Sequence, residues 1–515
     1  MASSCDGNRR FDTVAALCGV AVGASTYWLC LKFRMNKIPF AEERIGAIPP
    51  RMQNGIAAWI LGSRGDEAYI PEGKNCGYVY PLWFPDPMKK PARVRLIRSQ
   101  DIIIANPEDA DYVLVSEPDK FPKDVNYPIM LGPLLGRGLI TETDVKRHKS
   151  HRRELNPAFS PAALKDIAQS CFPSHAQDML GKLKSRSASS APMDVNELLA
   201  DTTMCIMAQA VFKVEKEEIA EVSQAFKLGV QGCWNLLRLV PVVGSCLWES
   251  DRMVAKSKNI LGRIIKVSTE AARQQAEGNV SGSGDSNRNR KMALIDYMIK
   301  SDKLTPSDFD DHCFSFMFAG FDTISHTLNN LTYLLARNPQ IQEKVFEELS
   351  SLLAPNTAAT LEDAKACRYL QCCIKETQRV FPTVLAVSRE PAEDVVLPGT
   401  GTFIPKGTHI DVSIWQLHHL KEVWGQDVNE FRPERWEEEP ELEERVGCAF
   451  VPFAAGRRNC IGKDFAMHEM LVLAATLLRN YRLLWPEGAP DVDFVAEPLW
   501  EPRKQFLLRV IPRPS

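Results

Sequence analysis

A single cysteine in a glycine-bounded loop limits the folds open to this chain. The segment FAAGRRNCIG, residues 453–462, places Cys460 between Gly456 and Gly462, which let the backbone fold tightly around the sulfur or lie against a flat group. An apolar helical pattern begins at Phe465, and its dipole, together with the nearby arginines, is expected to lower the pKa of the thiol. An ionised thiolate enclosed by backbone suits a metal ion. The alternative for any cysteine is a buried structural role.

The pattern F-x-x-G-x-R-x-C-x-G in this segment resembles the haem-binding loop of cytochrome P-450s, in which a cysteine thiolate is the axial ligand of haem iron. The resemblance implies haem b as the cofactor and Cys460 as its metal ligand. It also implies that Arg458 contacts a haem propionate, that Phe453 packs near the sulfur, and that Gly456 and Gly462 shape the loop around the cofactor.

The same resemblance implies a mainly α fold with small β-sheets (α+β), in which residues 46–515 form one large catalytic domain. The haem would lie between a long central helix and the helix after Cys460. The chain has 515 residues, enough for a large core, and its net charge of −3 gives no argument for nucleic-acid binding. Its 14 cysteines are scattered without C-x-x-C pairs, which is typical of a reducing compartment.

The N-terminal region, residues 1–45, carries an uncharged stretch at residues 14–31 followed by Lys32, Arg34 and Lys37. Eighteen helical residues rise about 27 Å, enough to cross a thin bilayer, and the basic residues favour the cytosol for the chain that follows. We therefore expect a single-pass anchor in the endoplasmic reticulum membrane, a hinge, and a cytosolic catalytic domain. A cleaved signal peptide is the alternative, but a basic stretch follows instead of a small-x-small site.

A long helix is predicted over residues 305–337, where Thr-Pro opens the pattern and Asn-Pro closes it. Its centre holds Ala319, Gly320, Asp322 and Thr323, although glycine costs a helix interior about 1 kcal/mol relative to alanine. The hydroxyl of Thr323 could open the helix slightly. The segment resembles the family's A-G-x-D/E-T motif, which implies room for O₂ at Ala319 and Gly320 and a catalytic proton relay through Asp322 and Thr323. A helix–helix contact at Gly320 is the alternative.

Further cations are assigned by the resemblance. The segment from His148 to Phe159 is similar to the family's W-x-x-x-R helix, which implies that Arg152 contacts a propionate and that His148 replaces the usual tryptophan there. Arg389 is implied to reach a propionate as well. Residues 383–387 should pass near the substrate. The apolar segment 127–139 is expected to be a loop that covers the pocket, or else an ordinary surface loop.

Two charged segments resemble the family's E-x-x-R and P-E-R-F elements. Glu376 and Arg379 share a helix face, and Arg435 lies in the segment FRPERW. Alone, the first pair would be an ordinary surface contact. The resemblance implies a buried cluster of all three that stabilises the fold and retains haem.

The remaining patterns predict strands within 94–105, a hairpin within 395–412, a strand pair around 504–510 and several helices over 195–278. The connection at 233–248 is apolar and could dip into a membrane or pack in the core, whereas residues 278–290 are polar and of low complexity. The acidic run at 437–444 is predicted to be a solvated loop.

The function implied is a haem-thiolate monooxygenase that inserts one oxygen atom from O₂ into a lipophilic substrate, either fatty-acid-like, terpenoid or sterol. About fifty residues follow Cys460, too few for a flavin domain, so electrons would come from an NADPH-dependent flavoprotein reductase, with cytochrome b5 as a further donor. The reductase is expected to dock near Arg457 and Lys463. Alternatives are a haem-thiolate isomerase or lyase that rearranges peroxides without O₂, and a haem carrier or sensor.

Overall fold

A computed structural model describes residues 79–83, 100–187, 191–214, 216–233, 248–278, 293–301, 303–490 and, with short gaps at 493, 497–498 and 503, residues 492–513. Contacts divide the chain into the units Met1–Ile48 and Pro49–Ser515, and all described residues belong to the second. The predicted anchor and hinge, most of the apolar connection and most of the polar segment lie outside them. Within the described ranges, no helix is long and apolar enough to cross a bilayer.

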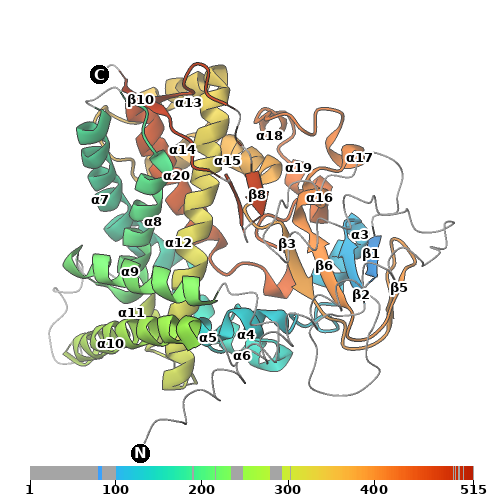
Figure 1. Ribbon diagram of the computed structural model, residues 1–515. Helices are drawn as coiled ribbons and strands as arrows, with labels where there is room; N and C mark the ends of the chain where they lie inside the picture. Colours follow the sequence, from blue (N-terminus) through green and yellow to red (C-terminus); the bar gives the residue numbers. More distant parts are fainter. Residues whose placement is uncertain are drawn as a thin grey trace, which may run out of the picture. The chain divides into compact units, whose positions relative to one another are not determined.

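The centre of the helical part is α12, Pro306–Arg337, which has the predicted bounds. Thr305 caps it by accepting from the backbone N–H of Asp308, and the Asp308 side chain returns the contact, so the first turn is closed by local chemistry. Figure 1 shows α12 (yellow) beside α8, Val195–Phe212, and α20, Lys463–Asn480, which both pack against it. Their buried hydrophobic side chains form one large cluster, beside buried polar residues such as Asn329, Asn330 and Glu469.

The other helices surround this core. They are α3 Pro107–Asp111, α6 Val145–Leu155, α7 Pro161–Ser187, α9 Lys216–Cys233, α10 Trp248–Gly278, α11 Leu294–Met298, α13 Pro339–Leu352, α14 Leu361–Ala366, α15 Arg368–Val380, α16 Ile414–His418 and α17 Lys421–Trp424, with a π-helical turn at Tyr112–Ser116 and 3-10 turns at Asn156–Phe159, Gly447–Ala449 and Gly456–Arg458. The helices predicted over 195–278 are confirmed as α8, α9 and α10.

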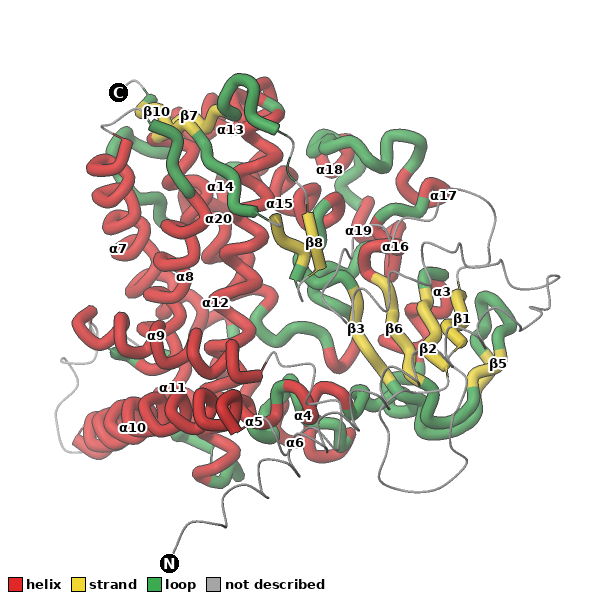
Figure 2. Tube along the Cα trace, in the orientation of Figure 1, coloured by secondary structure: helices red, strands yellow, loops and turns green. Residues whose placement is uncertain are grey.

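The largest sheet has the order β1-β2-β6-β3, formed by Val79–Trp83, Gln100–Ile104, His409–Ser413 and Ala386–Arg389. Strands β2 and β6 run parallel, and the other neighbours are antiparallel. Figure 2 shows these strands (yellow) apart from the long helices (red). The mainly α fold with small sheets is thus confirmed.

Three two-stranded sheets complete the described strands. They pair β4 Val395–Val396 with β5 Phe403–Ile404, β7 Tyr481–Leu484 with β10 Arg509–Pro512, and β8 Phe494–Ala496 with β9 Trp500–Pro502. The hairpin predicted over 395–412 is therefore only β4–β5, because β6 joins the larger sheet. Of the strand pair predicted around 504–510, only the start of β10 lies in that range, and β10 pairs with β7.

Two predicted loops are short helices instead. The segment 127–139 contains α4, Asn126–Met130, and α5, Gly132–Leu135, with Met130, Leu134 and Leu135 buried. The acidic run lies on α18, Arg435–Glu438, and α19, Leu442–Val446. In both cases burial of a few apolar side chains outweighs the turn-forming or charged residues that favoured a loop.

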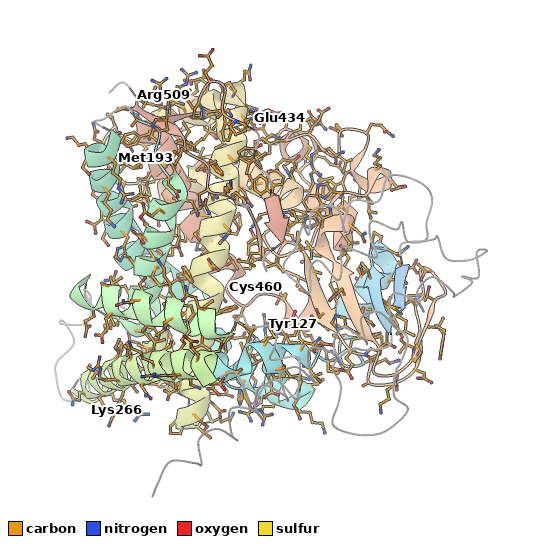
Figure 3. All side chains as sticks on the ribbon, in the orientation of Figure 1. Tyr127, Met193, Lys266, Glu434, Cys460 and Arg509 are labelled. Carbon is orange, nitrogen blue, oxygen red and sulfur yellow. The ribbon has the colours of Figure 1, made fainter. Side chains whose placement is uncertain are left out.

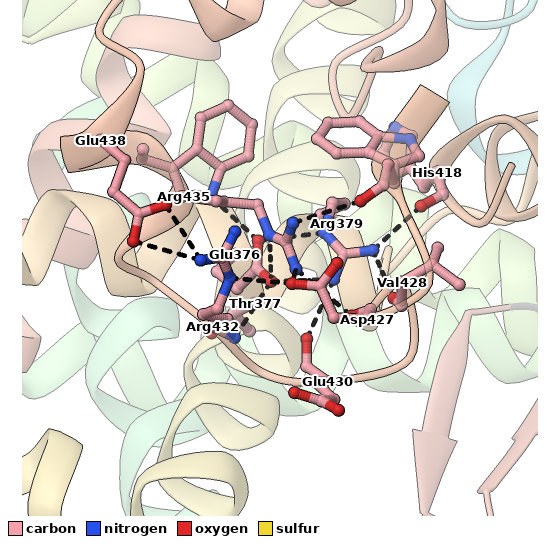
Figure 4. A network of polar contacts seen from close by, with 12 residues as sticks. Glu376, Thr377, Arg379, His418, Asp427, Val428, Glu430, Arg432, Arg435 and Glu438 are labelled. Carbon is pink, nitrogen blue, oxygen red and sulfur yellow. Dashed lines mark hydrogen bonds and ion pairs between the residues drawn. The ribbon is translucent and has the colours of Figure 1, made fainter. Parts of the chain in front are cut away.

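The predicted charge cluster is present and buried (Figure 4). Arg379 donates from Nε and Nη2 to the two carboxylate oxygens of Glu376 at 3.0 and 2.8 Å. Arg435 Nε donates to Oε1 at 2.9 Å, and the Trp436 indole donates to Oε2 at 2.9 Å. Arg379 also donates to three backbone carbonyls, those of His418, Val428 and Glu430. The cluster therefore joins α15 to the segment 418–436.

A histidine pair joins α6 to α12. Nε2 of His312 lies 3.1 Å from Nδ1 of His151, so one ring donates while the other accepts, which requires the accepting ring to be neutral. Burial, followed by the neighbouring His151, lowers the pKa of His312 to about 3.

This pair makes stability depend on pH. Unfolded His312 binds a proton below about pH 6.5, whereas the folded side chain stays neutral to pH about 3, so acidification favours the unfolded state by up to about 1.4 kcal/mol per pH unit. Between about pH 7 and about pH 5, the wild-type protein should therefore lose about 2 kcal/mol more stability than the His312→Gln protein. Chemical unfolding at both pH values measures this difference, and an unchanged pH dependence would contradict it.

Candidate active site

The cysteine loop runs from Phe453 to the start of α20 and is closed by a hydrogen bond from the Cys460 N–H to the Phe453 carbonyl at 2.9 Å. Gly456 has φ +69°, and a Cβ there would lie 1.8 Å from the carbonyl oxygen of Leu114, so only glycine fits. At Gly462 a Cβ would meet the Cys460 sulfur at 3.9 Å, which is an ordinary contact. The two glycines thus differ: Gly456 is required for packing, and Gly462 is not.

A cavity of about 310 Å³ lies against the sulfur. Figure 3 shows Cys460 beside α12, which forms one wall. Helix α12 contributes Ala319, Gly320, Thr323, Ile324 and Thr327, the segment after α15 contributes Thr383, Val384 and Val387, and the cysteine loop contributes Phe453, Cys460, Ile461 and Gly462. Nearly all of this lining is apolar. Residues 127–139, expected to cover the pocket, do not line it, although Ile140 does.

The α12 motif is only partly directed at the cavity. Thr323 lines it, and its hydroxyl donates to the Ala319 carbonyl at 2.6 Å within a continuous helix, so the expected opening is not seen. Asp322 does not line it, and its Oδ1 lies 3.4 Å from Nδ1 of His326. A Cβ on Gly320 would lie 2.3 Å from Cε of Met207 on α8. Gly320 therefore lines the cavity and also makes the helix–helix contact that was its alternative role.

A threonine pair, which the sequence did not reveal, joins two walls of the cavity. Oγ1 of Thr327 lies 2.8 Å from Oγ1 of Thr383, and Thr327 also reaches the Thr323 carbonyl at 2.8 Å. The segment 383–387, predicted to lie near the substrate, is thereby fixed to α12 at its first residue.

Four cations surround one polar region beside the loop. The pKa of His148 is lowered to about 2, first by burial and then by the positive charges of Lys123, Arg152, Arg389 and Arg458. Burial also lowers the pKa of Arg389 and Arg458, the latter to about 10, and lowers that of Lys123 well below its usual value. Lys123 is half-buried, and the surrounding protein removes its ammonium group from water.

These cations have few anionic partners among the described residues. Arg152 donates from both Nη atoms to the carbonyl and Oδ1 of Asn459, each at 2.6 Å, and so holds the residue before Cys460. Arg458 Nη1 donates to the Glu142 carbonyl at 3.0 Å, while its buried Nη2 has no hydrogen-bond partner. Lys123 Nζ donates to the carbonyls of Leu139 and Ile140. Gathering buried positive charge is costly unless an anion joins it, and the two propionates of haem fit that requirement.

The pKa of Cys460 differs from the expectation. Burial raises it, and this effect outweighs the Gly462 N–H, Arg152 and Lys123, which lower it. The predicted lowering is therefore wrong for the protein alone, because removal from water penalises a thiolate more than these groups favour it. Cys460 is exposed and lines the cavity, where a metal ion would restore the charged form.

Lys123 was missed in the sequence, although it stands in the segment KFPKD just before the apolar stretch. One lysine in a loop is usually solvated, and no local pattern marks it. Only the packing of its segment against β3 brings it to the cation cluster.

Comparison with known proteins agrees with this site. The family described as "Cytochrome P450" matches residues 89–509. The chain is 30% identical to "Cytochrome P450 4X1" of Rattus norvegicus over 73% of this chain and 75% of the relative. It is 29% identical to "Putative cytochrome P450 CYP13A7" of Caenorhabditis elegans over 74% and 79%, and 28% identical to "Cytochrome P450 4c3" of Drosophila melanogaster over 80% of each. The sulfur-lined cavity, its cation cluster and these matches together lead to one conclusion: the chain belongs to the cytochrome P-450 family.

Proposed function

We propose that this cytochrome P-450 monooxygenase, whose cofactor is haem b, acts on a lipophilic substrate of fatty-acid-like, terpenoid or sterol type. Electrons would come from NADPH through a separate flavoprotein reductase, with cytochrome b5 as a further donor. The observation that carries the substrate class is the cavity wall, which is apolar apart from a few hydroxyl and amide groups. Such a wall binds apolar surface and offers a soluble, charged compound no compensating partner.

The chain's own residues would hold and orient the reactants. Haem b bound through a cysteine thiolate supplies the activation of O₂. Cys460 is the thiol at the cavity and would be the ligand, while Arg458, Arg389 and Lys123 would bind the propionates. Arg152 would act mainly on the loop, through its two bonds to Asn459. His148 lies among these cations and would contact a propionate only as a neutral imidazole, because its pKa is lowered to about 2.

Proton delivery would pass through Thr323. Its hydroxyl lies at the cavity and donates to the Ala319 carbonyl, so it can accept a proton from water and pass its own toward the cavity by rotation. Asp322 lies one residue earlier, beside His326, and would return a proton to the Thr323 hydroxyl through ordered water. The apolar wall keeps other water away from the reacting atoms.

The location and partner follow from the sequence pattern. A single-pass anchor at 14–31 would hold the protein on the endoplasmic reticulum membrane with the catalytic domain in the cytosol. The reductase would dock near Arg457 and Lys463, which are both exposed. Arg457 pairs with Asp119 at 3.1 Å and Lys463 with Glu443 at 3.6 Å, so an acidic partner would have to replace these weak surface contacts.

The test is reconstitution in lipid vesicles with NADPH and a flavoprotein reductase, a panel of lipids, and mass spectrometry of products formed under ¹⁸O₂. We expect one labelled oxygen in a lipid product, and dependence on NADPH and reductase. Turnover of water-soluble compounds alone would contradict the substrate class, and turnover of peroxides without NADPH would favour the isomerase.

Replacing Thr323 by alanine should lower product formed per NADPH by on the order of 10-fold, with hydrogen peroxide released instead, because a positioned proton donor is lost. Thr332→Ala is the matched control, since Thr332 makes the same kind of bond within α12, to the Asn329 carbonyl, away from this cavity. Equal coupling in the Thr323 and Thr332 variants would contradict the relay.

A further inference from the structure

Lys123 and Arg389 belong to different segments that are held together by backbone. They form an antiparallel bridge between the chain before α4 and strand β3. Next to them, the Glu390 N–H donates to the Pro122 carbonyl at 3.0 Å, and the Ala392 N–H donates to the Lys120 carbonyl at 2.8 Å. The bridge therefore places two like charges side by side in the interior, where their repulsion opposes this arrangement.

A second set of charges lies behind this bridge. His409, on β6, contacts Asp124 from Nδ1 at 2.6 Å and Asp411 from Nε2 at 3.3 Å. Ser388 completes the chain, since its hydroxyl donates to Asp411 Oδ1 at 2.6 Å. Asp124 has no exposed side-chain surface, and His409 is 13% exposed. Burial lowers the pKa of His409, but Asp411 and Asp124 outweigh it and raise the pKa to about 11, so the imidazolium is charged at neutral pH.

The two sets of charges are linked by adjacent residues. Lys123 and Asp124 are neighbours, as are Arg389 and Ser388. In each pair one side chain belongs to the cation cluster and the other to the His409 network, as expected where extended backbone directs successive side chains to opposite faces. The register of β3 and β6 agrees with this placement of Ser388, because Ser388 lies opposite Asp411 in the two strands. His409 thus connects both segments that carry the cations.

We propose that the Asp124–His409–Asp411 triad is a positioning element that holds Lys123 and Arg389 at the propionate site and thereby controls how tightly haem is retained. This inference rests on the proposed role of these two cations. His409 would not touch the cofactor. It bridges two carboxylates, each linked to one cation-bearing segment, and so fixes the spacing of the cations against their mutual repulsion.

The measurement is the rate at which haem passes from the oxidised holoprotein to excess apomyoglobin. His409→Gln and Asp124→Asn should each raise this rate by about 10-fold, the effect typical of residues that orient a ligand's direct partners. The double variant should be no faster than either single one, because both break the same link. His409→Lys keeps a cation between the carboxylates and should restore slow release.

The control is His419→Gln, which removes another half-buried histidine, one that is stacked on Trp415 and bonded to its carbonyl. Equal haem release from the His409 and His419 variants would show general loosening and overturn the inference. Lys123→Gln separates the two proposals. If Lys123→Gln speeds release and His409→Gln does not, the triad has no positioning role. If Lys123→Gln leaves release unchanged, the propionate role of Lys123 fails, and this inference fails with it.

Discussion

The Cys460→Ala protein is expected to turn over no more product than a haem-free control and to lose the far-shifted Soret band of the reduced, carbon monoxide-bound form. Cys460 is the one cysteine among the cavity-lining residues that the structure describes, and no histidine lines that cavity there, so no second thiolate or imidazole is at hand to replace it. The band reports thiolate ligation directly. Its loss therefore tests the ligand independently of any substrate.

The matched control for this variant is Cys448→Ala. Cys448 precedes Cys460 by twelve residues, does not line the cavity, and its sulfur lies 3.8 Å from Oδ1 of Asp111. Its replacement removes the same atom and should leave the band and turnover unchanged. An undiminished band in Cys460→Ala would overturn the assignment of the ligand, and with it the proposed roles of the surrounding cations.

Elements with local signals were predictable from the sequence. Helix α12 begins and ends where a capping threonine and an Asn-Pro pair predict, because both ends are decided by residues within one turn. The buried Glu376 cluster was predictable only through the family resemblance, because the Glu376–Arg379 pair alone would be an ordinary surface contact. The resemblance of the cysteine loop likewise implied a cofactor site at Cys460, and this residue lines the cavity.

The properties that failed depend on surrounding atoms rather than on neighbours in sequence. The thiol pKa was misjudged because dipole and arginine effects can be read from the pattern, whereas desolvation cannot. Lys123 and the Thr327–Thr383 pair were missed because each contact joins segments far apart in the chain. A helix–helix contact was one of two roles expected for Gly320, but only the packing of α8 against α12 shows that its neighbour there is Met207.

His418 connects the Glu376 cluster to the start of the cysteine loop. Arg379 donates to the His418 carbonyl at 3.1 Å, and the His418 imidazole donates from Nδ1 to the Gln378 carbonyl at 3.1 Å. Its Nε2 accepts from the Val451 N–H at 2.9 Å, two residues before Phe453. Burial lowers the pKa of His418 well below its usual range, which keeps Nε2 free to accept. The start of the loop is therefore held by the same residues that pair with Glu376.

Replacing Glu376 by alanine should accordingly destabilise the protein by about 3–5 kcal/mol and reduce the haem bound per chain. Arg379 would keep its three carbonyl acceptors but lose its carboxylate while fully buried. Arg435 would keep only one carboxylate, that of Asp427 at 3.3 Å, and the carbonyls of Trp424 and Asp427. An uncompensated buried charge costs far more than a lost surface pair. Chemical unfolding followed by tryptophan fluorescence gives the stability, and absorbance of the purified protein gives the haem content.

Glu439→Ala is the comparison that isolates burial. Glu439 pairs with Arg445 through Nε at 2.5 Å and Nη2 at 3.0 Å, but both side chains are exposed, so its loss should hardly change stability and should leave haem content unchanged. Both variants remove a carboxylate that accepts two bonds from one arginine, but Glu376 is buried and also accepts from Arg435 and Trp436, whereas Glu439 is exposed. If they destabilised the protein equally, the cluster would be no more than a surface pair. If Glu376→Ala lost stability but kept its haem, the link through His418 to the cysteine loop would be wrong, because loosening Arg379 must then leave Val451 in place.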